Sequence, residues 1–191
     1  MKTIRTFIAV ATSPAVRGRA GELIDALRTA GADVKWVDPE NLHVTLKFLG
    51  DVDAREIHRV CKAVEAAVAG VGSFELEMRG AGAFPNAGRP RTVWLGAGNG
   101  HQQMATLNER IETAVEEFGF RREARRYQVH LTIGRVRRAG PGVAELGQLI
   151  QKHAEFEAGR TRVDEVIVFS SRLSFSGPTY EALARVPLAG E

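Results

Sequence analysis

The sequence predicts an α+β fold in which most strands pair antiparallel. Segments with the two-residue apolar period of strands alternate with segments that have the 3.6-residue period of helices. Short turns join several of the predicted strands, which antiparallel pairing permits and parallel pairing does not. The chain has 191 residues, of which 44% are hydrophobic, and no linker divides it, so it can bury a substantial core.

The first half of the chain is predicted to begin with a strand that Ser13-Pro14 closes. Gly31 is expected to end the first helix, and Gly50 is expected to end the strand over 42–49. Asp53 is a candidate N-cap for the second helix. In order, the expected elements are a strand (4–11), a helix (15–30), a short strand (34–37), a strand (42–49) and a helix (54–69).

The second half is predicted to contain a hairpin whose loop, 80–90, is rich in glycine and proline. Asn99 is expected to cap the following helix and Pro141 to open the last one. The chain then ends in two strands around the turn Ser176-Gly177-Pro178. In order, the expected elements are strands near 73–79 and 91–97, a helix (101–118), a strand (127–137), a helix (141–152) and strands over 162–175 and 180–188.

Two matched tetrapeptides are the main organisational feature. They are His43-Val44-Thr45-Leu46 and His130-Leu131-Thr132-Ile133, and they lie nearly half the chain apart. A strand and helices precede each of them, and a glycine follows each, Gly50 and Gly134. This arrangement indicates an old duplication.

Strand alternation places the polar side chains of each motif on one face. On the first strand His43, Thr45 and Lys47 are expected to face away from Val44, Leu46 and Phe48, and on the second His130 and Thr132 face away from the apolar residues. Residues two apart on a strand are separated by about 6.5 to 7 Å, which leaves room for a phosphate group. The alternative is a pair of half-buried histidines that hydrogen-bond to threonines.

Two imidazoles that face one phosphorus centre can carry out acid–base catalysis. An imidazole titrates near pH 6.5, so one ring can accept a proton from water while the other donates to a leaving alkoxide. Thr45 and Thr132 can donate hydrogen bonds to the non-bridging oxygens. Paired histidines are also typical of metal sites, but zinc-ligand spacings are missing and no Asp or Glu joins the exposed face of either motif. We therefore expect no metal and no cofactor, and no serine or cysteine nucleophile signature is present.

Arginines crowd around the second motif of a chain whose net charge is only +3. Such a patch suits a phosphate-bearing ligand, and a solvated basic loop is the alternative. The arginines are Arg121, Arg122, Arg125, Arg126, Arg135, Arg137 and Arg138, with Glu123 among them.

The location of the protein is predicted from its cysteine content and from the absence of long apolar runs. Cys61 is the only cysteine, which fits a reducing, cytoplasmic setting. The apolar run 7–11 is short and favours a strand over a signal peptide. No stretch approaches the roughly 20 apolar residues of a membrane span, so we expect no membrane partner. We also expect a monomer.

At the two motifs the chain resembles the two-histidine (2H) phosphoesterase superfamily. More closely, it resembles the RNA 2′,3′-cyclic phosphodiesterases, historically called 2′-5′ RNA ligases. The resemblance covers nearly the whole chain, with the two motifs as its specific part and the end segments as support. The residues that carry it are 5–10, Trp36, 41–50, 130–135, Ser171-Arg172-Leu173, Gly177-Pro178 and Tyr180.

The resemblance implies a bilobal fold with two antiparallel sheets flanking a central cleft, helices outside and pseudo-two-fold symmetry. Residues 1–191 would form a single domain with interleaved lobes. It implies hydrolysis of a 2′,3′-cyclic phosphate to a 2′-phosphate, with RNA 3′ ends or nucleotide 2′,3′-cyclic phosphates as partners and a weak reverse ligase reaction. His43 would be the proton donor and His130 the proton acceptor, an order that the nearly symmetric motifs themselves leave open.

Four further residues are candidates for the site. The family pattern carries an arginine where Arg135 stands, which makes it a candidate phosphate ligand. Strict alternation turns Arg135 away from His130, unless a bulge at Gly134 re-aims it. Trp36, Phe48 and Tyr127 are candidates for stacking on a base. Core packing is the alternative for all three and the preferred interpretation of Phe48.

Two alternative functions remain open from the sequence. The first is an RNA-binding module without catalysis, which the arginine patch would also serve. The second is a 2H phosphodiesterase for another cyclic phosphate, such as a cyclic nucleotide or a tRNA-splicing product.

Overall fold

A computed structural model of the chain describes residues 2–174 and 177–190. The predicted turn at Ser176 therefore lies outside the described residues. In chain order the elements are β1 (Thr3–Ala11), α1 (Pro14–Arg28), β2 (Val34–Trp36), η1 (Pro39–Asn41), β3 (His43–Asp53), α2 (Ile57–Val68), β4 (Phe74–Phe84), β5 (Thr92–Ala97), α3 (His101–Glu116), β6 (His130–Val136), α4 (Val143–Lys152), β7 (Glu157–Val163), β8 (Glu165–Ser174) and β9 (Gly177–Pro187).

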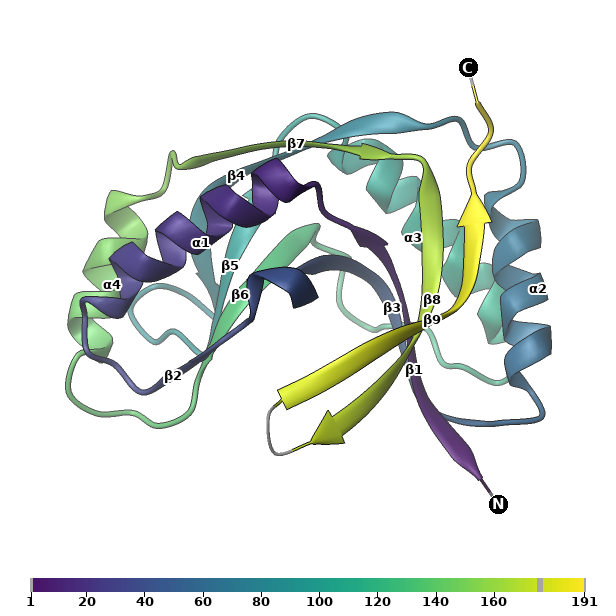
Figure 1. Cartoon of the computed structure of the whole chain (residues 1–191), viewed down its shortest axis with the longest axis horizontal. Coiled ribbons are helices and arrows are strands. Elements are labelled where there is room, and N and C mark those ends of the chain that lie inside the picture. Colours follow the sequence, from purple (N-terminus) through teal and green to yellow (C-terminus); the bar gives the residue numbers. More distant parts are fainter. Residues whose placement is uncertain (1, 175–176, 191) are drawn as a thin grey trace.

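The predicted α+β fold with antiparallel strands and two lobes is confirmed. The strands follow the order β7-β4-β5-β6-β3-β1-β8-β9, with β2 added on β6. The two expected sheets are thus joined into one curled sheet, and the pairing between them is a single residue pair, Val44 and Leu131. The elements form an arch, with α1 and α4 at one end and α2 and α3 at the other (Figure 1). The β8–β9 hairpin projects from the middle of this arch (Figure 1).

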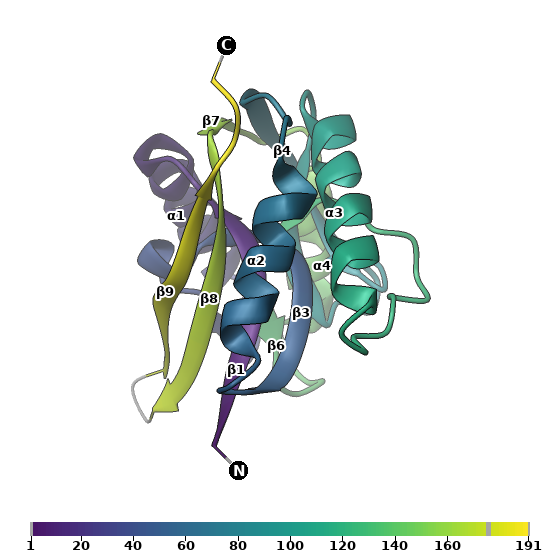
Figure 2. The same cartoon turned by 90° about the vertical axis from the view of Figure 1, so that its right-hand side faces the viewer.

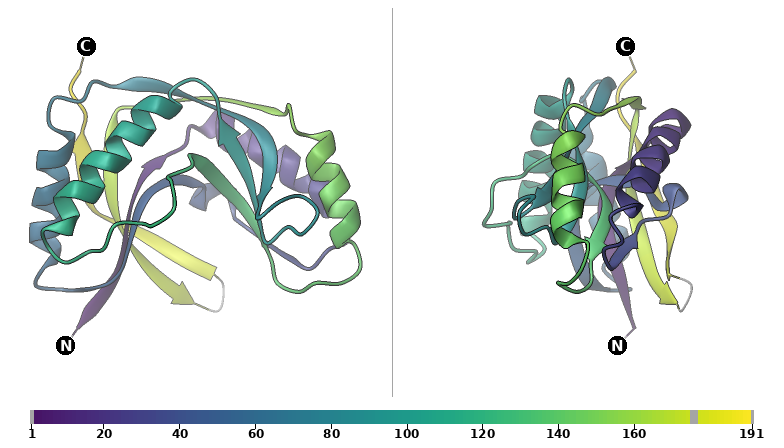
Figure 3. Two further views of the ribbon diagram at one scale, coloured as in Figure 1. Left: turned by 180° about the vertical axis from the view of Figure 1, so that it is seen from behind. Right: turned by 90° about the vertical axis from the view of Figure 1, so that its left-hand side faces the viewer.

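The chain passes repeatedly between the lobes. One lobe holds β2, β4, β5, β6 and β7 with α1 and α4, and the other holds β1, β3, β8 and β9 with α2 and α3. Helix α1 follows β1 in sequence but packs on β7 in the other lobe. Figure 2 views the α2 and α3 end of the molecule, and Figure 3 adds the view from behind and from the α1 and α4 end. The lobes therefore interleave.

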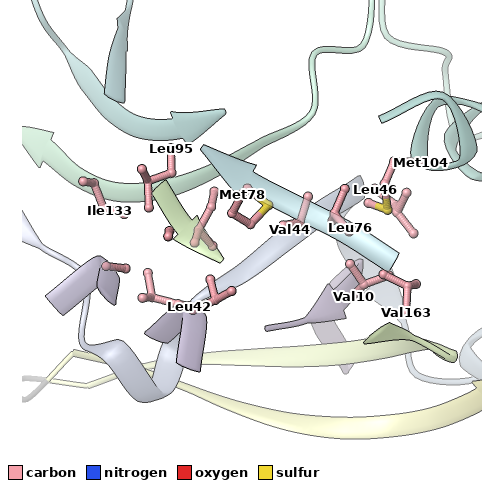
Figure 4. Packing of buried hydrophobic residues seen from close by; sticks show 14 of the residues in the cluster. Val10, Leu42, Val44, Leu46, Leu76, Met78, Leu95, Met104, Ile133 and Val163 are labelled. Carbon is pink, nitrogen blue, oxygen red and sulfur yellow. The ribbon is translucent and has the colours of Figure 1, made fainter. Parts of the chain in front are cut away.

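The core runs through both lobes without interruption. Its buried side chains come from strands of each lobe and from the helices, and Figure 4 shows part of the cluster. Val44 and Leu131, the central residues of the two motifs, are fully buried in it. Since side chains alternate along a strand, burial of these two residues turns their neighbours toward the opposite face of the sheet.

Both motif strands carry a bulge at the equivalent place. On β3 the partners of Ile8 and Ala9 are Lys47 and Thr45, so Leu46 is an extra residue. On β6 the partners of Val93 and Trp94 are Gly134 and Thr132, so Ile133 is the extra residue. A bulge shifts every later side chain to the other face of the strand.

The bulges decide where three side chains near the motifs point. Lys47 is buried and Phe48 is exposed, so the predictions that placed Lys47 beside His43 and Phe48 in the core are wrong. Gly134 stays on the buried side and Arg135 is exposed, which is the re-aiming that the glycine suggested. In both strands the prediction from strict alternation fails at the bulge, three residues after the histidine.

Several predicted boundaries also need correction. Strand β3 continues past Gly50, which has a φ of 72° and lies beside a second register shift. Strand β4 continues through much of the predicted loop 80–90 and contains Gly80 at a φ of 77°. The strand expected over 162–175 is two strands, and β7 begins already at Glu157. The strand expected from 127 begins only at His130.

The two predicted helix caps are wrong. The Asp53 carboxylate accepts a hydrogen bond from the Arg55 backbone in a turn that precedes α2, whose N-cap is Glu56. The N-cap of α3 is Gly100 at a φ of 89°, not Asn99. Both helices begin without a side-chain cap, so packing on the sheet rather than capping stabilises their ends.

Helix α3 holds the β3 bulge in place. The Lys47 ammonium lies 2.8 Å from the Glu112 carboxylate and donates to the Arg121 carbonyl at 2.7 Å. The two side chains of this ion pair are only 2% and 5% exposed. The Asn108 amide donates to the carbonyl of the extra residue, Leu46, at 2.8 Å. Two side chains of α3 therefore pair with the polar groups that the bulge buries, the Lys47 ammonium and the Leu46 carbonyl.

Lys47→Ala is expected to lower the free energy of unfolding by about 3 to 5 kcal/mol, because it leaves the buried Glu112 carboxylate without its cation. Urea unfolding at pH 7 measures the change. The double variant Lys47→Met/Glu112→Leu should regain most of the loss, since it removes both charges. A loss below about 1 kcal/mol for Lys47→Ala would contradict a structural role for this pair.

Candidate active site

A cavity of about 340 Å³ lies where the two lobes meet, and both motifs line it. His43, Thr45, His130 and Thr132 all contribute to its wall. The antiparallel pairing of Val44 with Leu131 explains this arrangement. One residue away on either side, the register sets His43 across from Thr132 and Thr45 across from His130. The structure thus brings together the two His/Thr pairs, each of which alternation had placed on one face of its own strand.

Each histidine is oriented by a backbone carbonyl two residues before it. The Nδ1 of His43 lies 2.8 Å from the Asn41 oxygen, and the Nδ1 of His130 lies 2.7 Å from the Gln128 oxygen. A carbonyl only accepts hydrogen bonds, so Nδ1 carries the proton in each neutral ring. It follows that Nε2 is the atom of each ring that can take up or release a proton.

Aromatic rings pack against both histidines. The His43 ring is 4.7 Å from that of Phe7 and 5.3 Å from that of Tyr180, and the His130 ring is 5.0 Å from that of Phe84. Burial lowers the pKa of His43, and the Asn41 carbonyl opposes this effect. Both rings are therefore biased toward the neutral form.

His130 has one further electrostatic neighbour. Burial lowers its pKa, the Gln128 carbonyl raises it, and the positive charge of Arg135 lowers it again. The same cation also acts on Tyr180. Burial raises the pKa of the Tyr180 hydroxyl, and the positive charge of Arg135 opposes this effect. The two histidines, although matched in sequence, thus differ in their charged surroundings.

The cavity is positively charged. Arg5, Lys35 and Arg135 line it, and no Asp or Glu of the described residues does. The Arg135 guanidinium donates to the Thr92 hydroxyl at 3.2 Å, which holds it at the cavity wall. Three cations without a carboxylate make this site suitable for an anion.

The three aromatic candidates lie in different places. Phe48 lines the cavity and is 58% exposed, so its ring is open to a ligand. Tyr127 is half-buried and its hydroxyl donates to the Thr45 carbonyl at 2.8 Å. Trp36 packs over Gly134, where an added Cβ would lie 2.7 Å from the indole. Tyr127 and Trp36 therefore support the motif strands.

Several residues at the cavity had no predicted role. Arg5, Lys35 and Tyr180 come from β1, β2 and β9, strands that carry no motif of their own. The resemblance included Arg5 and Tyr180 in its outer segments, which was the only signal available for them. Lys35 reaches the cavity because β2 pairs with β6, which the sequence pattern does not encode.

Residues 2–174 and 177–190 contain neither a cluster of metal ligands nor a helix that could span a membrane. Three or more His, Cys, Asp or Glu residues do not gather there in a group that could hold a metal ion. Within the same ranges, each helix is too short or too polar to cross a membrane.

The chain matches a family model described as the 2′-5′ RNA ligase superfamily, over residues 14–173. It is 40% identical to the RNA 2′,3′-cyclic phosphodiesterase of Methanothermobacter thermautotrophicus, over 93% of this chain and 95% of that protein. It is 32% identical to the RNA 2′,3′-cyclic phosphodiesterase of Thermotoga maritima, over 98% of this chain and 97% of that protein. Its fold is similar to the crystal structure of TT0787 of Thermus thermophilus, with a TM-score of 0.81 and 26% identity over 98% of this chain and 99% of that one.

In the free protein, His43 and His130 should titrate below the reference value of about 6.5, because burial disfavours both imidazolium ions. Adding inorganic phosphate should raise both pKa values, since a bound anion stabilises the charged rings. NMR titration of the ring protons measures both effects, with His43→Ala and His130→Ala assigning the signals. Values above about 6.5 without phosphate would contradict the inference that burial dominates the pKa of the two imidazoles.

Proposed function

The chain belongs to the 2′-5′ RNA ligase superfamily, and on this basis we propose that it is an RNA 2′,3′-cyclic phosphodiesterase. In this proposal it hydrolyses the cyclic phosphate at an RNA 3′ end to leave a 2′-phosphate. The observation that supports it most is the pair of histidines, each with its Nδ1 held by a carbonyl and its Nε2 left for proton transfer, in one positively charged cavity.

In the proposed mechanism the two histidines act in sequence on one phosphorus atom. Nε2 of neutral His130 accepts a proton from water, and the oxygen attacks phosphorus. The bond from phosphorus to O3′ breaks, and Nε2–H of protonated His43 gives its proton to O3′. Arg135 supports this order, because its charge favours the neutral form of His130 that a base requires. Proton exchange with solvent then restores both rings.

The remaining polar groups would stabilise the charge that builds on the phosphate. Thr45 and Thr132 are in position to donate hydrogen bonds to non-bridging oxygens, and Arg135 adds a charge-assisted contact. Phe48 offers its exposed ring to the terminal base. The reaction proposed here uses protein side chains alone and needs no metal ion.

The same geometry would also support a weak ligase reaction, in which an RNA 5′-hydroxyl replaces water as the nucleophile. If the 5′-hydroxyl of a second RNA takes the place of water, His130 accepts its proton and a 2′-5′ linkage forms. His43 serves the departing O3′ in both cases.

His43→Ala and His130→Ala should each lower turnover of an RNA with a 2′,3′-cyclic end by about 10² to 10⁴, the usual contribution of one acid or base. The assay runs in EDTA and identifies the 2′-phosphate product by resistance to a 3′-phosphatase. Wild-type activity that disappears in chelator would contradict a metal-free reaction. RNA binding without turnover would favour a binding module instead.

Arg135→Ala should lower kcat/KM roughly 10²-fold if the guanidinium contacts the phosphate in the transition state. It should also move the acidic limb of the kcat/KM profile to higher pH, because the cation that lowers the pKa of His130 is gone. Arg138→Ala is the matched control, since Arg138 is exposed and does not line the cavity. A loss below twofold for Arg135→Ala would show that Arg135 makes no contact with the phosphate.

A further inference from the structure

We propose that a groove beside the His130 end of the cavity binds the RNA nucleotides that precede the terminal cyclic phosphate. This inference rests on the proposed function and extends it to the choice of substrate. An enzyme with such a groove prefers an RNA strand to a cyclic mononucleotide.

The groove is continuous with the central cavity and larger than it. Its volume is about 710 Å³, compared with about 340 Å³ for the cavity. Thr45, Phe48 and His130 line both, so a ligand can pass from one to the other. Its remaining walls come from α3, from residues 122–128 and from Phe84-Pro85. A ligand held at His130 therefore has space to continue along this groove.

The charges of the groove leave two arginines available to bind phosphates. Of its three carboxylates, Glu112 is paired with Lys47 and Glu109 with Arg122, while the exposed Glu123 forms no ion pair with any residue that the structure describes. The four cations of the groove, Lys47, Arg122, Arg125 and Arg126, still outnumber its three carboxylates. Arg125 and Arg126 are exposed, and within residues 2–174 and 177–190 neither forms an ion pair. Free guanidinium groups of this kind contact the phosphodiesters of a nucleic-acid backbone.

Apolar and aromatic surface accompanies these cations. Phe48 is 58% exposed at the junction with the cavity, and Phe84, whose ring packs against His130, lines the groove together with Pro85. Cations together with flat aromatic rings are the usual means of binding single-stranded RNA, because each base can stack while its phosphate is neutralised. The chemistry of the groove thus favours an RNA strand over an acidic peptide, which would leave the rings without bases to stack on.

The groove exists because the two halves of the site close their sheet edges differently. Beyond the motif in β6, the Ile133 carbonyl accepts from the Val37 backbone, so β2 and the residue after it cover that edge. Beyond the motif in β3, side chains satisfy the equivalent carbonyls, Asn108 that of Leu46 and Tyr127 that of Thr45. The backbone of β3 therefore needs no further strand to pair its carbonyls. The space beside β3 remains open as the groove, whereas β2 fills the equivalent space beside β6.

The test compares two substrates and two double variants. The substrates are adenosine 2′,3′-cyclic phosphate and a six-nucleotide RNA with a 2′,3′-cyclic end. Arg125→Ala/Arg126→Ala removes the two free cations of the groove. Arg137→Ala/Arg138→Ala removes the same charge from the same arginine-rich part of the chain, but neither residue lines the groove or the cavity.

The wild type should show a higher kcat/KM for the RNA than for the mononucleotide. The groove variant should lose roughly tenfold on the RNA, and less than twofold on the mononucleotide. Its plot of log kcat/KM against log salt for the RNA should be less steep by about 1.4, the value for two lost contacts to a single strand. The control variant should stay within twofold of wild type on both substrates.

Equal losses on the two substrates, or an equal loss in the control variant, would overturn the inference. If the wild type turned over neither substrate, the proposed function would fail instead. Fluorescence anisotropy with a 2′-phosphorylated six-nucleotide RNA tests the groove without turnover, and the groove variant should bind it roughly tenfold more weakly. Displacement of that RNA by an acidic peptide at equal charge and concentration would point to a protein partner and would also overturn the inference.

Discussion

The pairing of Val44 with Leu131 is the contact on which the site depends. It is the point where the sheets of the two lobes join, and both side chains are fully buried in the shared core. An antiparallel pair at this position makes the two motifs face each other about a local two-fold axis, so that each histidine lies near the threonine of the other motif. Without this register the two histidines would belong to separate sheets. The apolar residue inside each motif is therefore as much a part of the site as the polar ones.

The symmetry created at this point is broken within a few residues. Each strand has a bulge three residues after its histidine, and each bulge turns the fifth residue after the histidine back toward the cavity. In one half that residue is Phe48 and in the other it is Arg135, so one side presents an aromatic ring and the other a charge. The supports differ too, with the Lys47–Glu112 ion pair and Asn108 behind β3, and β2 with Trp36 behind β6. The two pseudo-symmetric halves thus present different side chains to the cavity.

The electrostatics of the site follow from its position between the lobes. Aromatic rings from β1, β4 and β9 pack against the histidines, and burial of the two imidazoles favours their neutral form. The cavity cations come from strands of both lobes. An entering phosphate therefore meets fixed positive charge and can stabilise the imidazolium ion that general acid catalysis requires. In the proposed mechanism, binding of the anionic substrate is therefore coupled to protonation of His43.

The sequence by itself determined the fold class, the two motif strands and the common face of His43 with Thr45 and of His130 with Thr132, because alternation and periodicity are local properties that single residues report. It also signalled the β6 bulge, since Gly134 is a residue that such sites favour. No equivalent signal marked the β3 bulge, where a lysine stands, and so Lys47 and Phe48 were assigned to the wrong faces. Only the tertiary structure decided these faces, the recruitment of Arg5 and Lys35, and the difference between the two sheet edges. Each of these depends on which strand pairs with which and in what register, and that is set by burial of distant residues against each other rather than by the local chain.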